Sequence, residues 1–229
     1  MKVIGIIGGI GPASTVEYYN RIINGYREKT NNNNYPQLLI NSINMTEMLS
    51  YVSNNDYGKL IDLLVKEIGK LKMIGADYVA IASNTPHCVI DEVIEKSTLP
   101  IISIVEETCK YAKNLGMKKV LLTGTIFTME RDFYKKSFDK FDIECVVPND
   151  IDKSIIHNII FPNLENGIII EKDKLVFKDI CGKIIKDQNI DGIILGCTEL
   201  PLMIKENDFD IVVIDTMDIH IKGILERMV

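Results

Sequence analysis

The feature that most constrains this chain is an internal repeat. The run from Asp77 to Ser83 (DYVAIAS) returns as Asp191 to Cys197 (DGIILGC), and a proline closes each copy a few residues later. The chain start, Lys2 to Gly8, likewise resembles Lys119 to Gly124. Two copies of one unit, each of about 100 residues, explain these pairs, because that is a usual domain size.

Short apolar runs rich in β-branched residues predict strands that are buried on both faces. Amphipathic segments over 57–74 and 172–188 predict helices between them. Strand and helix alternate throughout, which favours parallel sheets. The predicted fold class is therefore α/β, with two pseudo-symmetric Rossmann-like domains, mainly parallel sheets and a cleft between the domains. The predicted strands are Val3–Ile7, Leu38–Ile43, Tyr78–Ala82, Ile101–Val105, Val120–Thr123, Ile143–Val147, Ile193–Leu195 and Ile211–Ile214.

We expect the first half-domain to span 1–98 and to be completed by 208–229, and the second to span 99–207. Ligands of open α/β sheets bind outside the carboxyl ends of the strands. Half-domains that face each other would therefore place Ser83 and Cys197 on opposite walls of one cleft. The asparagine run from Asn31 to Asn34 is expected to be a surface loop.

Composition narrows the class of protein. The 229 residues carry a formal net charge of −6, which argues against a general electrostatic attraction to nucleic acid or to an anionic membrane. The apolar runs stay well short of the roughly 20 residues that a membrane helix needs. Strand-like sequence starts at Lys2, which leaves no room for a signal peptide. Five cysteines without close pairing fit reduced thiols, so we expect a cytoplasmic protein.

The glycine-rich loop after the first predicted strand is a candidate anion site. Gly9, Ile10 and Gly11 precede a predicted helix, whose N-terminus favours a negative charge. The second strand ends without the acidic residue that dinucleotide binding needs, and no Gly-Lys-Ser/Thr follows, so NAD and P-loop binding are not expected. The loop is predicted to hold a small carboxylate; a plain strand-to-helix turn is the alternative.

The second candidate site follows the third predicted strand. Asn84 and Thr85 offer donors to a carboxylate, Ser83 would point at the ligand, and His87 lies one turn further on. As an alternative, Ser83 simply caps a helix and His87 is a structural imidazole.

The third candidate is the segment Gly196-Cys197-Thr198-Glu199. A thiol at a strand end beside a helix N-terminus is expected to have a lowered pKa, which favours the reactive thiolate. Isolated cysteines are more often inert. The repeat singles out Cys197 because it corresponds to Ser83. Thr198 and Glu199 are candidate ligand contacts.

The fourth candidate is the start of the second copy. Thr125 and Thr128 follow its first strand and are predicted to bind a second carboxylate of the same ligand. No cysteine or histidine pair has the spacing of zinc ligands, so no metal is expected. His157 and His220 receive no role.

Together these segments resemble the aspartate/glutamate racemase family, the cofactor-independent amino-acid racemases. The resemblance rests on the G-G-x-G-P loop, N-T-P-H at 84–87, T-x-x-T-M-E at 125–130, Asp132-Phe133-Tyr134, and G-C-T-E at 196–199. His87 and Glu199 favour the aspartate-type or broader aspartate/glutamate branch, because glutamate racemases tend to carry other residues there.

The resemblance implies a two-base mechanism on a small dicarboxylic amino acid. One thiolate removes the α-proton, and a group on the opposite face returns one. Cys197 and the residue at 83 would be catalytic, and Asn84, Thr85 and Thr198 would stabilise the transition state. The resemblance also implies no pyridoxal phosphate and a homodimer. Catalysis in a cleft predicts hinge closure on the ligand.

The chain departs from the family at Ser83, where a cysteine is usual. Three explanations stay open: an engineered Cys→Ser exchange, a natural branch with a hydroxyl on one face, or lost activity. Some aspartate-specific members also place an arginine after the second strand, where this chain has Asn44 to Glu47. Two other functions remain: a one-thiol decarboxylase of malonate-type acids, and a protein that binds a dicarboxylate without turning it over.

Overall fold

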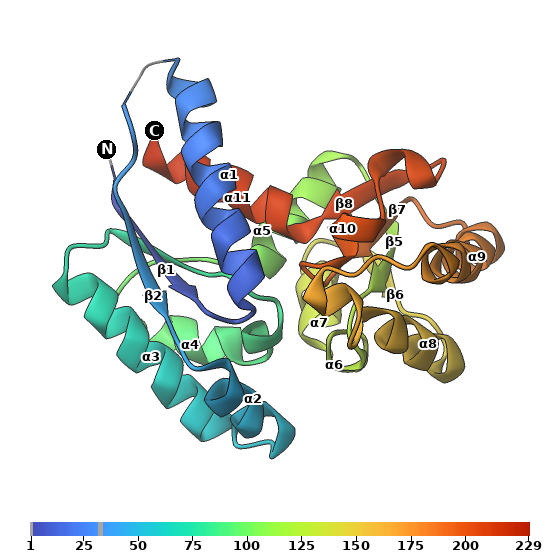
Figure 1. The fold of residues 1–229 in the computed structure, drawn as a ribbon, viewed down its shortest axis with the longest axis horizontal. Coiled ribbons are helices and arrows are strands. Elements are labelled where there is room, and N and C mark those ends of the chain that lie inside the picture. Colours follow the sequence, from blue (N-terminus) through green and yellow to red (C-terminus); the bar gives the residue numbers. More distant parts are fainter. Residues whose placement is uncertain (1, 32–33) are drawn as a thin grey trace. The chain divides into compact units, whose positions relative to one another are not determined.

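Eight strands form two parallel sheets of the same topology. The computed structural model describes residues 2–31 and 34–229; Asn32 and Asn33, within the expected loop, lie outside the described residues. The strand orders are β2-β1-β3-β4 and β6-β5-β7-β8 (Figure 1). Each order places the first strand of a copy between its second and third, so the structure confirms the α/β class and the duplication.

The chain divides into two compact units, residues 1–107 with 220–229, and residues 108–219. The helices α5 (Ile104–Asn114) and α11 (Thr216–Met228) contribute residues to both units. The other elements of the first unit are β1 (Ile4–Gly8), α1 (Pro12–Thr30), β2 (Leu38–Ser42), α2 (Met45–Ser53), α3 (Tyr57–Met73), β3 (Tyr78–Ile81), η1 (Thr85–Val89), α4 (Ile90–Lys96) and β4 (Ile101–Ile102).

The second unit repeats the alternation of strand and helix. Its elements are β5 (Lys119–Thr123), α6 (Ile126–Glu130), α7 (Phe133–Asp139), β6 (Glu144–Val146), α8 (Asp150–Ile160), η2 (Leu164–Asn166), α9 (Glu171–Gln188), β7 (Gly192–Leu195), α10 (Leu200–Met203), η3 (Glu206–Asp208) and β8 (Val212–Asp215).

These units correct two sequence assignments. Segment 99–107 was expected in the second half-domain, but β4 pairs with β3. Segment 208–219 was expected in the first, but β8 pairs with β7. In both cases the fourth strand of a copy stays with its own sheet.

The predicted strand Ile101–Val105 is also too long, since β4 ends at Ile102. Ser103 accepts backbone hydrogen bonds from Glu106, through its side chain at 3.3 Å, and from Glu107, through its carbonyl at 2.9 Å. These bonds satisfy the first amides of α5, so the apolar run passes from strand into helix.

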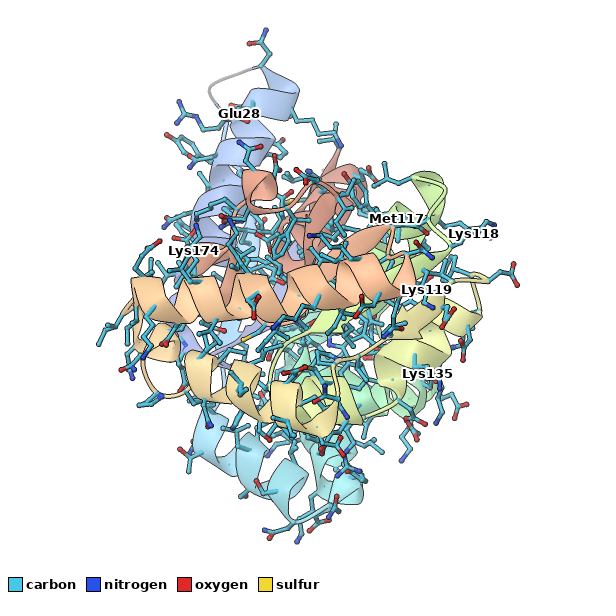
Figure 2. All side chains as sticks on the ribbon, turned by 90° about the vertical axis from the view of Figure 1, so that its right-hand side faces the viewer. Glu28, Met117, Lys118, Lys119, Lys135 and Lys174 are labelled. Atoms are coloured by element: carbon cyan, nitrogen blue, oxygen red, sulfur yellow. The ribbon has the colours of Figure 1, made fainter. Side chains whose placement is uncertain are left out.

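One aspartate holds the start of each sheet. The Asp77 carboxylate accepts the Val3 amide at 2.8 Å. The equivalent Asp191 carboxylate accepts the amides of Lys118 and Lys119 at 2.7 and 2.8 Å. Figure 2 shows both lysines where β5 begins. The repeated aspartates are therefore structural, and each joins the third strand of its sheet to the first.

In the second unit, α8 and α9 pack against each other beside the sheet (Figure 1). The apolar cluster between them includes Ile156 of α8, Phe177 of α9, Leu121 of β5 and Ile193 of β7, and these four side chains are fully buried. Burying an apolar side chain of this size contributes about 1.5–3 kcal/mol. This core supports the strand ends where Thr125 and Cys197 lie.

The pKa of the Asp208 carboxyl is strongly shifted in this unit. Its carboxylate, 11% exposed, meets the ammonium groups of Lys174 and Lys178 at 2.9 and 3.0 Å. Figure 2 labels Lys174 near the start of α9. Burial raises the carboxyl pKa, but hydrogen bonds from Lys174, the Lys205 amide and Lys178 together lower the pKa of Asp208 to about 2.

We expect Asp208→Asn to destabilise the second unit by about 1–2 kcal/mol at pH 7. Because the folded-state pKa is depressed, this stabilisation is complete above the unfolded value of about 4 and is lost as pH falls towards 2. Urea unfolding of both proteins at pH 7, 4 and 3 measures it. A difference that stays constant across this range would contradict the ion-pair account.

Candidate functional site

The predicted site residues lie at the carboxyl ends of the strands in both units. In the first unit, the glycine loop follows β1 and Ser83 follows β3. In the second, Thr125 follows β5 and Cys197 follows β7. Since neighbouring parallel strands end at one edge of a sheet, each unit brings its own candidates together there.

The glycine loop is held by internal contacts. Gly9 adopts a φ of 83°, and a Cβ at this position would lie 2.5 Å from the Ile43 carbonyl oxygen, so a glycine is required. The Gly9 amide donates to Thr15 Oγ1 at 2.8 Å. Gly9 and Ile10 are buried, and Gly11 is half-buried at the start of α1. The Gly9 amide is therefore already bonded within the loop, and the predicted carboxylate contact by Gly9, Ile10 and Gly11 stays a prediction.

The Ser83 segment forms a tight turn into η1. The Ser83 amide donates to the Ile81 carbonyl at 2.9 Å, and Ser83 and Asn84 are 9% and 4% exposed. Thr85, the first residue of η1, is half-buried. Ser83 is therefore buried just beyond the end of β3, and its role toward a ligand stays a prediction.

His87 lies within η1, and its side chain points into the protein interior. Its side chain is fully buried, and Nδ1 lies 2.8 Å from the Ser83 carbonyl oxygen. Since a carbonyl only accepts, Nδ1 carries the proton and donates. Nδ1 is therefore bonded to the backbone of Ser83, whereas the buried Nε2 has no hydrogen-bond partner within the described residues, and the ligand contact by His87 stays a prediction.

A second buried histidine lies in the same unit. His220 Nε2 donates to the Ile102 carbonyl at 2.8 Å, so Nδ1 accepts from the Tyr18 hydroxyl at 2.8 Å. Burial, followed by the charge of His220, lowers the pKa of His87 to about 3. Burial also lowers the pKa of His220 to about 4, with Arg227 contributing. The sequence assigned His220 no role, because its partners are remote in sequence.

Because both histidines have lowered pKa values, we expect the first unit to lose folding stability as the pH falls. Their folded-state pKa values lie below the unfolded value of about 6.5, so the stabilisation is complete above pH 6.5 and decreases as pH falls. Each histidine should cost about 2 kcal/mol of folding stability by pH 5. Urea unfolding between pH 7 and 5 measures this loss. In His87→Phe, which keeps a ring but cannot titrate, the pH dependence should fall by about half; an unchanged dependence would contradict the assignment.

Thr125 and Thr128 contact each other. Thr125 is the N-cap of α6: its Oγ1 accepts the Thr128 amide at 3.3 Å and lies 3.2 Å from Thr128 Oγ1. Thr128 is buried and Thr125 is half-buried. Capping therefore uses part of the hydrogen-bonding capacity that the sequence assigned to a ligand carboxylate, and Thr125 is the more accessible of the two.

Cys197 and Glu199 are hydrogen-bonded to each other at the start of α10. Cys197 is 7% exposed and its thiol donates to Glu199 Oε2 at 3.0 Å. Thr198 Oγ1 donates to the same oxygen at 2.9 Å. Glu199 thus lies beside the thiol, where the sequence expected a ligand contact.

The pKa of Cys197 moves in the direction opposite to the prediction. Burial raises it well above the usual thiol range, and the charge of Glu199 raises it further. The amides of Glu199 and Leu200 act in the lowering direction, but α10 has only four residues and its dipole is correspondingly small. The resting side chain is therefore a thiol.

The other four cysteines are free thiols as well. Burial raises the pKa of Cys145 to about 12, and it raises the pKa of Cys181 further. Cys109 is fully buried and Cys88 is half-buried in η1.

Glu165 is a neighbour that the sequence did not indicate. It lies in η2, which packs against α10, and its carboxyl is half-buried. Burial and then the charge of Glu199 raise the pKa of Glu165. No spacing rule links η2 to the β7 end, so only the fold could bring these two carboxyls together.

The described residues contain neither a metal-site cluster nor a membrane-spanning helix. Across 2–31 and 34–229, no three His, Cys, Asp or Glu side chains are grouped as a metal site would need. In the same ranges, no helix combines the length and apolar character required to cross a membrane.

The duplicated fold, with a cysteine at the end of the third strand of its second copy, defines a class: the amino-acid racemases built from two α/β units. The family model described as Asp/Glu/hydantoin racemase matches residues 7–224, so the chain belongs to this family.

The similarity to relatives extends over all or nearly all of this chain. An aspartate racemase homologue from Pyrococcus horikoshii OT3 is 38% identical, with a TM-score of 0.89, and covers 100% of this chain and 99% of that one. A Yersinia pestis protein with an Asp/Glu racemase assignment is 30% identical, with a TM-score of 0.93 and the same coverage. The broad specificity amino-acid racemase RacX of Bacillus subtilis is 27% identical over 93% of this chain and 92% of its own length.

Proposed function

We propose that this chain racemises aspartate and, as a second substrate, glutamate, without pyridoxal phosphate. Cys197 exchanges a proton with one face of the α-carbon and Ser83 serves the other. The observation that carries the proposal is the Cys197 thiol at the carboxyl end of β7, hydrogen-bonded to a carboxylate. Removal of an α-proton by a thiol requires a proton acceptor next to that thiol.

The remaining groups stabilise charge. An α-proton beside a carboxylate is a very weak acid, so the enediolate-like transition state needs preorganised donors. We propose that Asn84 and Thr85, which follow β3, supply them. Thr198, beside Cys197, would supply a further donor only by releasing its hydroxyl from Glu199. The glycine loop and Thr125 are the candidate contacts for the substrate carboxylates, at Gly11 and the Thr125 hydroxyl.

One observation favours a second candidate substrate class. Glu165 and Glu199 are near enough to interact: burial raises the pKa of Glu165, and the charge of Glu199 raises it further. A side-chain carboxylate would add a third negative group there, whereas a neutral or cationic side chain would not. The family relative named broad specificity racemase fits this alternative, in which the chain acts on amino acids that lack a distal carboxylate.

The test is deuterium wash-in at the α-carbon in D₂O, followed by NMR and mass spectrometry. The substrates are both enantiomers of aspartate, glutamate, alanine and lysine. Exchange of aspartate and glutamate supports the first substrate class, and exchange confined to alanine or lysine supports the second. Release of carbon dioxide from a substituted malonate would identify a decarboxylase. Ligand binding without exchange, unchanged in Cys197→Ala, would identify a binding protein.

We also propose a cytoplasmic homodimer. The family resemblance supports the dimer, and five free thiols fit a reducing compartment. Sedimentation equilibrium across a tenfold concentration range measures the assembly, and a monomer throughout would contradict it.

A further inference from the structure

The Ser83 carbonyl and its counterpart in the second copy are bonded by different kinds of donor. In the second copy, the Cys197 carbonyl accepts the Leu200 amide at 3.2 Å. Position 86 corresponds to Leu200 in the repeat, but it is a proline, which has no amide proton. The Ser83 carbonyl accepts the imidazole Nδ1–H of His87 at 2.8 Å. A side chain therefore takes the place of the backbone donor that the proline lacks.

His87 closes the turn after β3 through two of its own groups. Its amide donates to the Asn84 carbonyl at 3.0 Å, and its imidazole donates to the Ser83 carbonyl. On the other side of Ser83, its amide donates to the Ile81 carbonyl at 2.9 Å. A peptide group is planar, so a bond to its carbonyl or its amide orients the whole group. With both flanking peptide groups held, the direction in which the Ser83 side chain leaves the backbone is fixed.

The imidazole is suited to hold this bond and not to transfer a proton. A carbonyl only accepts, so Nδ1 keeps its proton and the ring is held in one tautomer. Nε2 then carries the lone pair, and in the part of the chain that the structure describes it is buried without a hydrogen-bond partner. Burial, followed by the charge of His220, lowers the pKa of His87 to about 3. The ring is therefore neutral near pH 7 and its bond to the carbonyl persists.

We propose that His87 is a positioning residue: its imidazole replaces the backbone donor missing at Pro86 and so orients Ser83 for proton transfer on its face of the α-carbon. This inference rests on the proposed function of Ser83. The two copies thereby orient their reactive side chains by different bonds, a backbone bond at Cys197 and a side-chain bond at Ser83. An amide returned to position 86 should therefore make the imidazole dispensable.

The variants that test this role change the donor and keep the shape of the side chain. His87→Asn keeps an N–H at the position of Nδ1, whereas His87→Leu has nearly the same shape as His87→Asn and no donor. Pro86→Ala restores an amide, and it is made alone and together with His87→Leu. Each variant is made in the full chain, both as it stands and with Ser83→Cys, which places a thiol at the position under test.

The first measurement separates the two faces of the α-carbon. In the proposed mechanism, deuterium wash-in without inversion needs only Cys197, whereas inversion also needs position 83. His87→Leu should lower the ratio of inversion to wash-in by about 10-fold to 10²-fold, because misplacement by about 1 Å has effects of that size. General loosening of the fold would lower both rates together and leave the ratio unchanged.

The variants that still offer a donor should keep a ratio close to that of the parent. These are His87→Asn, Pro86→Ala and the double variant Pro86→Ala/His87→Leu. Equal ratios in His87→Asn and His87→Leu would overturn the inference. A double variant that inverts as slowly as His87→Leu would overturn it as well.

The second measurement is urea unfolding, which uses no substrate. A buried carbonyl without its donor should raise the unfolding equilibrium constant of His87→Leu about 5- to 30-fold. Pro86→Ala should recover part of this loss in the His87→Leu background and bring no gain in the parent, where the imidazole already bonds the carbonyl. The entropic effect of removing the proline is common to both backgrounds and cancels in the cycle.

An equal effect of Pro86→Ala in both backgrounds would contradict the exchange of one donor for the other. Absence of wash-in from the parent and from Ser83→Cys would instead overturn the proposed function. The unfolding cycle then decides the hydrogen-bond exchange by itself, so the two failures are distinguishable.

Discussion

Ser83→Cys is expected to raise the rate of inversion of aspartate by about 10²-fold or more, in both directions. A positioned general acid–base group contributes about 10²–10⁴-fold, and its effect requires a pKa near the working pH. A thiol has a pKa of about 8.5, whereas a serine hydroxyl is a far weaker acid. His87 does not compensate, because its imidazole donates to the Ser83 carbonyl and leaves the hydroxyl without a histidine base.

The measurement is loss of optical activity together with deuterium wash-in, starting from each enantiomer. Ser83→Ala is the matched control. If the hydroxyl takes no part in proton transfer, the parent and Ser83→Ala will invert equally slowly while Ser83→Cys exceeds both. If the hydroxyl acts on one face, Ser83→Ala will lose inversion from one enantiomer first. No gain in Ser83→Cys would contradict the two-base interpretation.

Cys197→Ala is expected to reduce α-proton exchange by at least about 10³-fold, because it removes the acid–base group and leaves only the donors that stabilise the transition state. Wash-in under single-turnover conditions measures the loss. Cys145→Ala, remote in sequence and half-buried on β6, should retain parental exchange. Exchange that survives in Cys197→Ala would require another base and would remove the basis of the proposed mechanism.

The strands could be predicted from the sequence because continuous β-branched runs have few alternatives in a chain of this composition. The run from Ile143 to Val147 contains β6, and the run from Ile193 to Leu195 contains all but the first residue of β7. The run from Ile101 to Val105 was predicted to be one strand, but the strand ends at Ile102 because Ser103 caps the helix that follows. The sheet to which the fourth strand of each copy belongs could not be predicted, because it depends on pairing and not on local pattern.

The chemical properties of the site residues could be predicted less well than the strands. Motifs indicate which residues lie at a strand end, but burial and neighbouring charge decide what those residues can do. The sequence located Cys197, yet the direction of its pKa shift depends on burial and on Glu199. His87 was predicted as a ligand contact, but its complete burial and the bond from Nδ1 to the Ser83 carbonyl could not be predicted from the motif. Glu165 had no sequence signal at all.

The division of the chain has a consequence for synthesis on the ribosome. The second unit is one uninterrupted stretch, 108–219, and can fold as soon as it has emerged. The first unit emerges earlier but lacks α11, whose His220 bonds Tyr18 and Ile102 and whose Arg227 meets Glu107 at 2.8 Å. The half that is translated first is therefore completed last, because these partners of Tyr18, Ile102 and Glu107 are absent until translation has passed Arg227.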